Sequence, residues 1–335
     1  MSLIGTSSIR PWGDIDWILP KIGPRQWKGL LCASFEPRCT AVAEWLSAID
    51  SSQTHCCLKI SDPENRFTSE TEKLTKLHEE KIKKLLNNKV DVIQAHLLSE
   101  ASTWNQIISD LSSEENSSIL LDISSLPKRF FLFAIKRLLV NQNVKDLIVC
   151  YTRPEGYKEG QLTEDAEPPS ALPGFSRIEP ASGDSTAIIS VGYMAFNLAE
   201  VLEQHRGKSP KFLFPFPPGS PSFRRSWALL HNLAPNLEYH TEIKRIHAMD
   251  MFAALDWIKS VGNETTRNID LIPLGPKPHV LAMALAFPTL GDRAEIIYAQ
   301  PRLYHPDYSH GILRNSAGKP DIITYCLKRD HIDYV

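Results

Sequence analysis

The residues best suited to chemistry lie in a loop that follows a predicted strand, residues 122–129 of this 335-residue chain. Ser124 and Ser125 supply hydroxyl donors there, and Lys128 or Arg129 supplies positive charge. A proline at the first turn of a helix leaves neighbouring backbone N–H groups pointing outward, where they attract anions. The loop therefore predicts contact with a phosphate or another anion. A serine before proline is also an ordinary helix N-cap, so a purely structural role stays open.

Two carboxylates are the candidate acid or base groups. Glu36 lies in the loop after the first predicted strand, and Asp122 lies at the end of the fourth. A carboxylate beside a ligand crevice can remove or donate a proton. Asp122 could instead hold a ribose hydroxyl or cap the neighbouring loop, and Glu36 could be a cap or a salt-bridge partner. Ser34 and Arg38, which flank Glu36, are candidate ligand contacts.

The loops after the first and fourth predicted strands have counterparts in the second half of the chain. The loops after the fifth strand of each half form another matched pair. Glycine lets a ligand approach the backbone closely, lysine and arginine suit phosphate, and tyrosine suits stacking on a base. A loop of packed aromatic side chains is the structural alternative. The remaining candidate ligand contacts in these loops are Arg153, Gly192, Tyr193, Gly275, Lys277, Arg302 and Tyr304.

The elements that must position these loops alternate between strands and helices. This order is typical of βαβ units and of a mainly parallel sheet. Charged pairs spaced i,i+4, such as Glu72/Lys76 and Glu79/Lys83, support a long helix between the second and third strands. In the first half we expect strands at 30–33, 55–60, 90–95, 118–123 and 144–151, with helices near 40–49, 68–86, 104 and 127–140.

The second half repeats this order. Trp104 and Trp257 are 153 positions apart, and Pro127-Lys128 precedes Pro276-Lys277 by 149. These matches predict a tandem duplication, whereas a single large sheet is the alternative because all βαβ units resemble one another. We expect strands at 187–191, 211–216, 243–248, 269–274 and 295–300, with helices near 198–203, near 257, and from 276 to just before 288.

The predicted fold is α/β, with two tandem Rossmann-like parallel-sheet units related by internal duplication. If each half has the common strand order 3-2-1-4-5, the order reverses between strands 1 and 4, and ligands bind outside the carboxyl ends of the strands at such a point. The expected boundaries are 1–28 for an N-terminal extension, 29–157 for the first unit, 158–184 for a linker, 185–311 for the second unit, and 312–335 for a C-terminal tail whose strand, 321–327, lies at an edge.

Charge and cysteine content narrow the functional classes. The chain carries 37 Lys+Arg against 39 Asp+Glu, a net charge of −2, so we expect no broad nucleic-acid-binding surface. The most apolar run, 280–287, is too short to span a bilayer. Six cysteines without a C-x-x-C pair predict buried, reduced thiols in a cytoplasmic protein. The sequence lacks G-x-G-x-x-G, G-x-x-x-x-G-K-[ST] and metal-ligand spacings, so it names no cofactor and predicts no metal.

The segment Asp122-x-Ser124-x-x-x-Lys128 resembles the second ligand motif of CRISPR-associated Rossmann-fold (CARF) sensor domains. Such domains bind cyclic oligonucleotides across a two-fold dimer axis, and two fused copies would resemble a covalent form of that dimer. In the second half, Leu271 and Pro273 replace the Asp and Ser of the motif. The resemblance implies a sensor whose effector is a separate protein.

Three functions are consistent with the sequence. The first is a sensor or interaction subunit that binds a nucleotide or another small phosphorylated ligand, in a defence or signalling system. The second is a hydrolase or transferase acting on a nucleotide-like substrate, with Glu36 or Asp122 as the base and with Lys128 and Arg153 holding phosphate. The third is a structural subunit of a larger complex.

Overall fold

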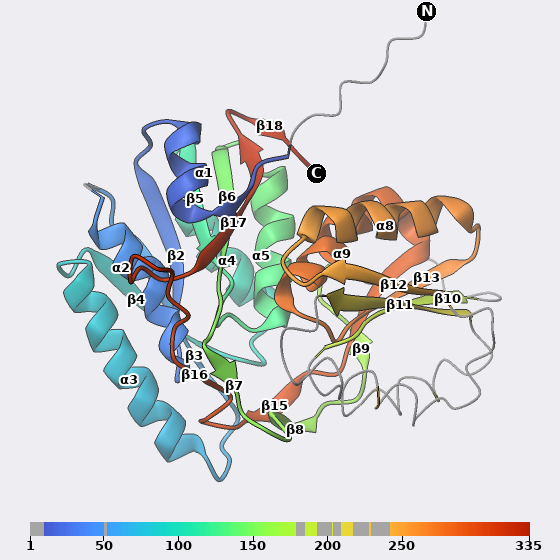
Figure 1. Cartoon of the computed structure of the whole chain (residues 1–335), viewed down its shortest axis with the longest axis horizontal. Coiled ribbons are helices and arrows are strands. Elements are labelled where there is room, and N and C mark those ends of the chain that lie inside the picture. Colours follow the sequence, from blue (N-terminus) through green and yellow to red (C-terminus); the bar gives the residue numbers. More distant parts are fainter. Residues whose placement is uncertain are drawn as a thin grey trace, which may run out of the picture. The chain divides into compact units, whose positions relative to one another are not determined.

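The computed structural model describes residues 10–49, 52–178, 185–192, 203, 209–216, 228 and 242–335. The chain divides into two compact units, which we describe separately. Unit 1 comprises residues 1–127, 137–157 and 309–335, and unit 2 comprises residues 128–136 and 158–308. Figure 1 colours the elements of both units by their position in the chain, from blue near the N-terminus to red near the C-terminus.

Unit 1 is built on a sheet in which five neighbouring strands, from β6 to the edge strand β4, are parallel. Its strands are β1 (Trp12–Asp14), β2 (Trp27–Ala33), β3 (His55–Ser61), β4 (Val90–His96), β5 (Ser117–Asp122), β6 (Val144–Thr152), β17 (Ile322–Arg329) and β18 (Ile332–Asp333). The order is β1-β17-β6-β5-β2-β3-β4, with β18 paired to β17. β17 is antiparallel to both of its neighbours in this order, β6 and β1. The short pair β7 (Gly156–Tyr157) and β16 (Ser309–His310) lies outside this sheet.

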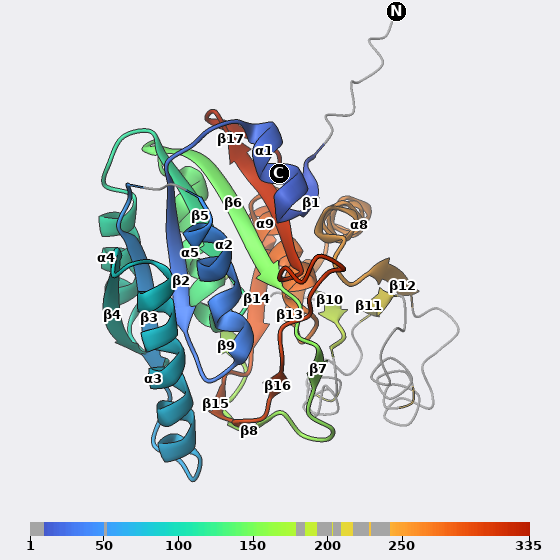
Figure 2. The same ribbon diagram turned by 60° about the vertical axis from the view of Figure 1, so that its left-hand side comes forward.

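The helices of unit 1 connect the parallel strands. They are α1 (Ile15–Ile22), η1 (Pro37–Thr40), α2 (Ala41–Ser47), α3 (Thr68–Leu85) and α4 (Ala101–Leu111), while α5 (Lys128–Val140) begins in unit 2 and ends in unit 1. One apolar cluster joins α1, α2 and α3 to the sheet, with Leu31, Val42 and Ile82 almost fully buried in it. Figure 2 shows α2 and α3 on one face of this sheet. Burial of these side chains is the main force that fixes the helices on the sheet.

Unit 2 has a second sheet, which also contains five neighbouring parallel strands. Its strands are β9 (Ser170–Ala171), β10 (Ser185–Ser190), β11 (Ser209–Phe216), β12 (Glu242–His247), β13 (Asn268–Pro273) and β14 (Ala294–Tyr298), in the order β12-β11-β10-β13-β14-β9. Helices α8 (Met251–Glu264) and α9 (Lys277–Leu290) and the short η2 (Gly291–Arg293) belong to this unit, as does the pair β8 (Thr163–Ala166) and β15 (Pro301–Tyr304).

The predicted α/β class and strand order are confirmed. The parallel strands run 3-2-1-4-5 in each unit, because β4-β3-β2-β5-β6 and β12-β11-β10-β13-β14 correspond one to one. Common descent of the two units by duplication stays a prediction. The helix expected near 198–203 lies mostly outside the described residues. The helix opened by Pro276 continues to Leu290 rather than ending before Pro288, since a proline in the last turn removes only one backbone hydrogen bond.

Three segments differ from the expected boundaries. Residues 12–22 form β1 and α1 and contribute to the core of unit 1, rather than an extension. The expected linker contains β8 and β9, which pair with β15 and β14 of unit 2. The C-terminal strand β17 lies inside the sheet of unit 1, between β6 and β1, rather than at an edge. Antiparallel pairing between distant segments has no local pattern, which is why the sequence did not reveal these partners.

The six cysteines are all buried and form no disulfide. Burial raises the pKa of Cys56 to about 12, so this thiol stays protonated near neutral pH. No helix in the described part of the chain combines the length and the apolar character that a bilayer span requires.

Candidate functional site

The loop after β2 directs its charged side chains to partners within unit 1. Glu36 Oε2 accepts hydrogen bonds from Arg38 Nε at 2.9 Å and from Ser309 Oγ at 2.5 Å. Arg38 Nη2 lies 2.8 Å from the same oxygen. The two charged residues are only 6% and 2% exposed, respectively. Ser34 Oγ accepts the Glu36 N–H at 3.3 Å. The geometry favours the salt-bridge interpretation of Glu36 over an acid–base role.

Aromatic groups and a histidine complete this cluster. The Arg38 guanidinium lies 5.6 Å from the ring centroid of Tyr151 and 5.8 Å from that of Tyr157, and it donates a hydrogen bond to the Tyr151 hydroxyl. His78 Nδ1 donates to the Ser34 carbonyl at 2.7 Å. Burial lowers the pKa of His78, which favours the neutral ring. The predicted contacts Ser34 and Arg38 therefore serve the packing of the loop.

The loop after β5 is also held by its own side chains. Asp122 Oδ1 accepts hydrogen bonds from the N–H of Ser124 at 2.9 Å and from the Ser124 hydroxyl. Ser124 Oγ accepts the Thr152 N–H at 2.8 Å, and Ser125 Oγ donates to the Cys32 carbonyl at 3.0 Å. Asp122 and Ser124 are 0% exposed. The carboxylate caps its loop, the alternative considered from the sequence, and the serines tie β5 to β6 and β2.

Lys128 and Arg129, at the start of α5, contact groups of unit 2. Lys128 Nζ donates to the Pro273 carbonyl at 2.6 Å and lies 5.2 Å from the ring centroid of Tyr298. Burial lowers the pKa of Lys128 to about 7. Arg129 Nη1 lies 4.0 Å from Glu167 Oε2. Because burial weakens the positive charge of Lys128 near neutral pH, this helix start is less suited to phosphate than its sequence indicates.

The glycine loops of unit 2 pack directly against each other. A Cβ on Gly192 would lie 2.1 Å from a backbone oxygen of the loop after β13. A Cβ on Gly275 would lie 1.8 Å from a serine hydroxyl at the end of β10. The absence of side chains therefore serves loop packing. Lys277 Nζ lies 6.0 Å from the ring centroid of Phe131, and Tyr193 lies outside the described residues.

The arginines of the predicted strand 5 loops form ion pairs with nearby carboxylates. Arg153 Nη2 pairs with Asp321 Oδ2 in unit 1. Arg302 Nε lies 3.8 Å from Asp165 Oδ2 in unit 2, where both side chains are exposed. The Tyr304 hydroxyl accepts a hydrogen bond from a nearby glutamine amide at 3.0 Å. These residues thus lie in separate local networks.

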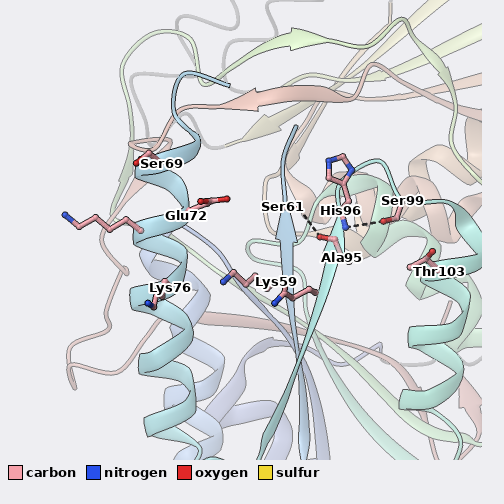
Figure 3. Close-up of a pocket in the computed structure, with 11 residues that line it drawn as sticks. Lys59, Ser61, Ser69, Glu72, Lys76, Ala95, His96, Ser99 and Thr103 are labelled. Carbon is pink, nitrogen blue, oxygen red and sulfur yellow. Dashed lines mark hydrogen bonds between the residues drawn. The ribbon is translucent and has the colours of Figure 1, made fainter. Parts of the chain in front are cut away.

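A cavity of about 800 Å³ lies instead at the carboxyl ends of β3 and β4, in unit 1. The strands contribute Lys59 and Ser61 from β3 and Gln94, Ala95 and His96 from β4. Ser61 Oγ donates to the Ala95 carbonyl at 3.3 Å, which joins the two strand ends (Figure 3). The cavity therefore occupies the carboxyl edge at which open α/β sheets bind ligands, although not at the strand 1/strand 4 reversal.

Two helices complete the cavity wall. The first half of α3 supplies Ser69, Glu72, Lys73 and Lys76, and the start of α4 supplies Thr103. Figure 3 shows Glu72 projecting from α3 toward the strand ends. Ser69 and Thr103 belong to the first turns of their helices, so both helices begin beside the cavity.

The charge of the cavity is predominantly positive. Lys59 Nζ lies 3.2 Å from Glu79 Oε2, and Lys83 Nζ lies 2.6 Å from Glu79 Oε1. Among the residues that the structure describes, none forms an ion pair with Lys73 or Lys76. The predicted i,i+4 pair Glu79/Lys83 is thus present, whereas Glu72 and Lys76 stay apart. Three lysines and one carboxylate line the cavity, which suits an anion.

His96 forms a turn that fixes the end of β4. Its Nδ1 accepts the Leu98 N–H at 3.2 Å, and its backbone N–H donates to Ser99 Oγ at 3.1 Å. With Nδ1 an acceptor, a neutral ring carries its proton on Nε2 as a donor. Unit 2 has the same turn at the end of β12, where His247 Nδ1 accepts the Met249 N–H at 3.2 Å. The match adds a local detail to the correspondence between the two units.

The sequence-based site and the cavity share no residue. Lys73 and Lys76 resemble the solvated charges of any polar helix, so their pattern held no specific signal. A weak signal existed in Lys59-x-Ser61 and Gln94-x-His96, where polar side chains end two apolar strands. For metals, the described residues contain no group of three or more His, Cys, Asp or Glu side chains arranged to hold an ion.

Comparisons with known proteins assign no family. No family model and no curated protein matches the chain. Similar solved structures include the cytoplasmic domain of a prokaryotic cation chloride cotransporter, 12% identical over 83% of this chain and 96% of that one, with a TM-score of 0.24. They also include a universal stress protein from Archaeoglobus fulgidus DSM 4304, 12% identical over 82% and 96% of the two chains, with a TM-score of 0.26. At these TM-scores the likenesses carry no argument, so the α/β assignment rests on the sheet topology.

Proposed function

We propose that the protein is a sensor or interaction subunit that binds a small phosphorylated ligand in the cavity at the ends of β3 and β4. The observation that carries this proposal is the set of cavity lysines, Lys59, Lys73 and Lys76, of which the last two have no ion-pair partner among the described residues. Ammonium groups and hydroxyls around one cavity are suited to a phosphate dianion.

The volume of the cavity agrees with a ligand of this size. Small-molecule sites commonly measure about 300–1,000 Å³, and this cavity measures about 800 Å³. A mononucleotide or a sugar phosphate fits within that range. The ligand would lie on a rigid sheet edge, since β3 is parallel to both β2 and β4.

Binding is better supported than catalysis. The two candidate bases, Glu36 and Asp122, are buried and bonded to neighbouring side chains in unit 1. A general base must reach the proton that it removes, and burial of this kind limits access. A separate effector protein and the resemblance to CARF domains stay predictions, and the proposal does not depend on them.

The test is ligand binding to the whole chain. We expect inorganic phosphate and AMP at low ionic strength to raise the melting temperature, since a ligand at 100 times its Kd adds about 2.7 kcal/mol of stability. The double variant Lys73→Ala/Lys76→Ala should weaken binding by about tenfold or more, because each charge-assisted hydrogen bond contributes about 1.5–3 kcal/mol. Lys84→Ala, an exposed change later on the same helix, is the matched control. If no phosphorylated compound binds at saturating concentration, the proposal is wrong.

A further inference from the structure

The side chains around the cavity differ in kind from those of a base-binding site. Apart from the lysines, most of them carry a hydroxyl or an amide: four hydroxyls from Ser61, Ser69, Ser99 and Thr103 and one amide from Gln94. The one ring in the wall is the imidazole of His96. Nucleobases are commonly held by stacking on aromatic side chains, at about 1–3 kcal/mol for each base. A wall of hydroxyls suits a sugar better than a base.

Glu72 adds a carboxylate to the cavity wall. Its carboxylate is exposed in the cavity wall, and it forms no salt bridge with Lys76, one turn further along α3. A carboxylate in a phosphate-binding cavity repels the phosphate, and this cost is offset where the carboxylate accepts hydrogen bonds from another part of the ligand. Its two oxygens can accept hydrogen bonds from the two hydroxyls of a vicinal diol. Glu72 lies on the same cavity wall as Lys73 and Lys76, so this wall offers a hydrogen-bond acceptor for a diol beside positive charges for a phosphate.

From this arrangement we propose that the cavity recognises a sugar phosphate, with Glu72 accepting hydrogen bonds from a vicinal diol and with Lys73 and Lys76 holding the phosphate. The inference rests on the proposed function and names the ligand class of that same cavity. A nucleotide binds through its sugar and phosphate, and its base contributes little to affinity.

The experiment compares four compounds by isothermal titration calorimetry on the full chain: inorganic phosphate, ribose 5-phosphate, AMP and adenosine. Ribose 5-phosphate should bind about tenfold or more tighter than phosphate, because tenfold corresponds to about one hydrogen bond to a charged group. AMP should bind within about fivefold of ribose 5-phosphate, and adenosine should bind far more weakly than either.

The variant Glu72→Gln should affect the binding of two of these ligands differently. The affinity for ribose 5-phosphate should fall by about tenfold, because a charged acceptor is lost. The affinity for inorganic phosphate should stay unchanged or rise, because a repulsive charge is lost. Lys84→Ala should change neither affinity. Glu72 is exposed on its helix, so the substitution should leave the melting temperature of the free protein nearly unchanged.

The outcomes separate this inference from the proposed function. If AMP binds about 100-fold tighter than ribose 5-phosphate, the base is recognised and the inference is wrong. It is equally wrong if phosphate and ribose 5-phosphate bind alike, or if Glu72→Gln weakens both to the same degree. In each of these cases a phosphorylated ligand still binds, and the proposed function stands. If neither phosphate nor any phosphorylated compound binds, both proposals fail.

Discussion

Two regions of unit 1 lie at the carboxyl ends of different parallel strands of one sheet, and their charged side chains have different surroundings. The loops after β2 and β5 direct Glu36, Arg38 and Asp122 to internal partners, and these three residues are at most 6% exposed. The ends of β3 and β4 border a cavity where Lys73 and Lys76 are exposed and have no ion-pair partner among the described residues. The difference indicates that the first region maintains the fold and that the second is available to a ligand.

The largest expected effect comes from the buried ion pair. Arg38→Ala leaves the Glu36 carboxylate buried with its cationic partner removed, so we expect a loss of about 3–5 kcal/mol of unfolding free energy. Urea denaturation measures it. The double variant Glu36→Gln/Arg38→Met should recover part of the loss, since no uncompensated charge stays buried. A loss below about 1 kcal/mol for Arg38→Ala would show that this region does not maintain the fold.

A pH effect should follow from another buried polar group of unit 1. His55 Nδ1 accepts the Gly29 N–H at 3.0 Å, and burial, with a smaller effect from Lys89, lowers the pKa of His55 to about 4. Between pH 6.5 and 4 the unfolded chain binds a proton that the folded chain does not. The contribution of His55 to the free energy of unfolding should therefore be fully present above pH 6.5. It should fall by about 3 kcal/mol as the pH drops to 4.

The variant His55→Gln isolates this contribution from other titrating groups. Its unfolding free energy should depend less steeply on pH than that of the wild type across the same interval. Urea melts at pH 7, 5.5 and 4 provide the comparison. Equal slopes for the two proteins would mean that His55 is protonated as easily in the folded chain as in the unfolded one.

A smaller loss is expected for the loop after β5. Ser124→Ala removes the acceptor of the Thr152 N–H and one donor to Asp122. A buried donor left without its acceptor costs about 1–3 kcal/mol, which denaturant unfolding can resolve. Ser69→Ala, at an exposed hydroxyl of the cavity wall, should change stability by less than about 0.5 kcal/mol. If the two variants have the same free energy of unfolding, the loop after β5 does not stabilise the fold more than the cavity wall does.

The sequence predicted the fold much better than the site. Strands such as β5 and β6 are almost continuously buried, and α3 has helical spacing, so local pattern was enough to identify them and to infer their order. The partner of Glu36, Ser309, is 273 positions away, and no local pattern marks it. The cavity depends on how α3 and α4 pack beside β3 and β4, which is a tertiary property. Lysines that line it have the same spacing as lysines on any solvated helix.

The most direct test of the account compares the lysine favoured by sequence with the lysines of the cavity. Binding of ribose 5-phosphate is measured by calorimetry for wild type, Lys128→Ala and Lys73→Ala/Lys76→Ala at the same ionic strength. The account predicts wild-type affinity for Lys128→Ala and a loss of about tenfold or more for the double variant. Loss of binding in Lys128→Ala, with wild-type affinity in the double variant, would contradict it. That result would mean that the ligand binds at the start of α5.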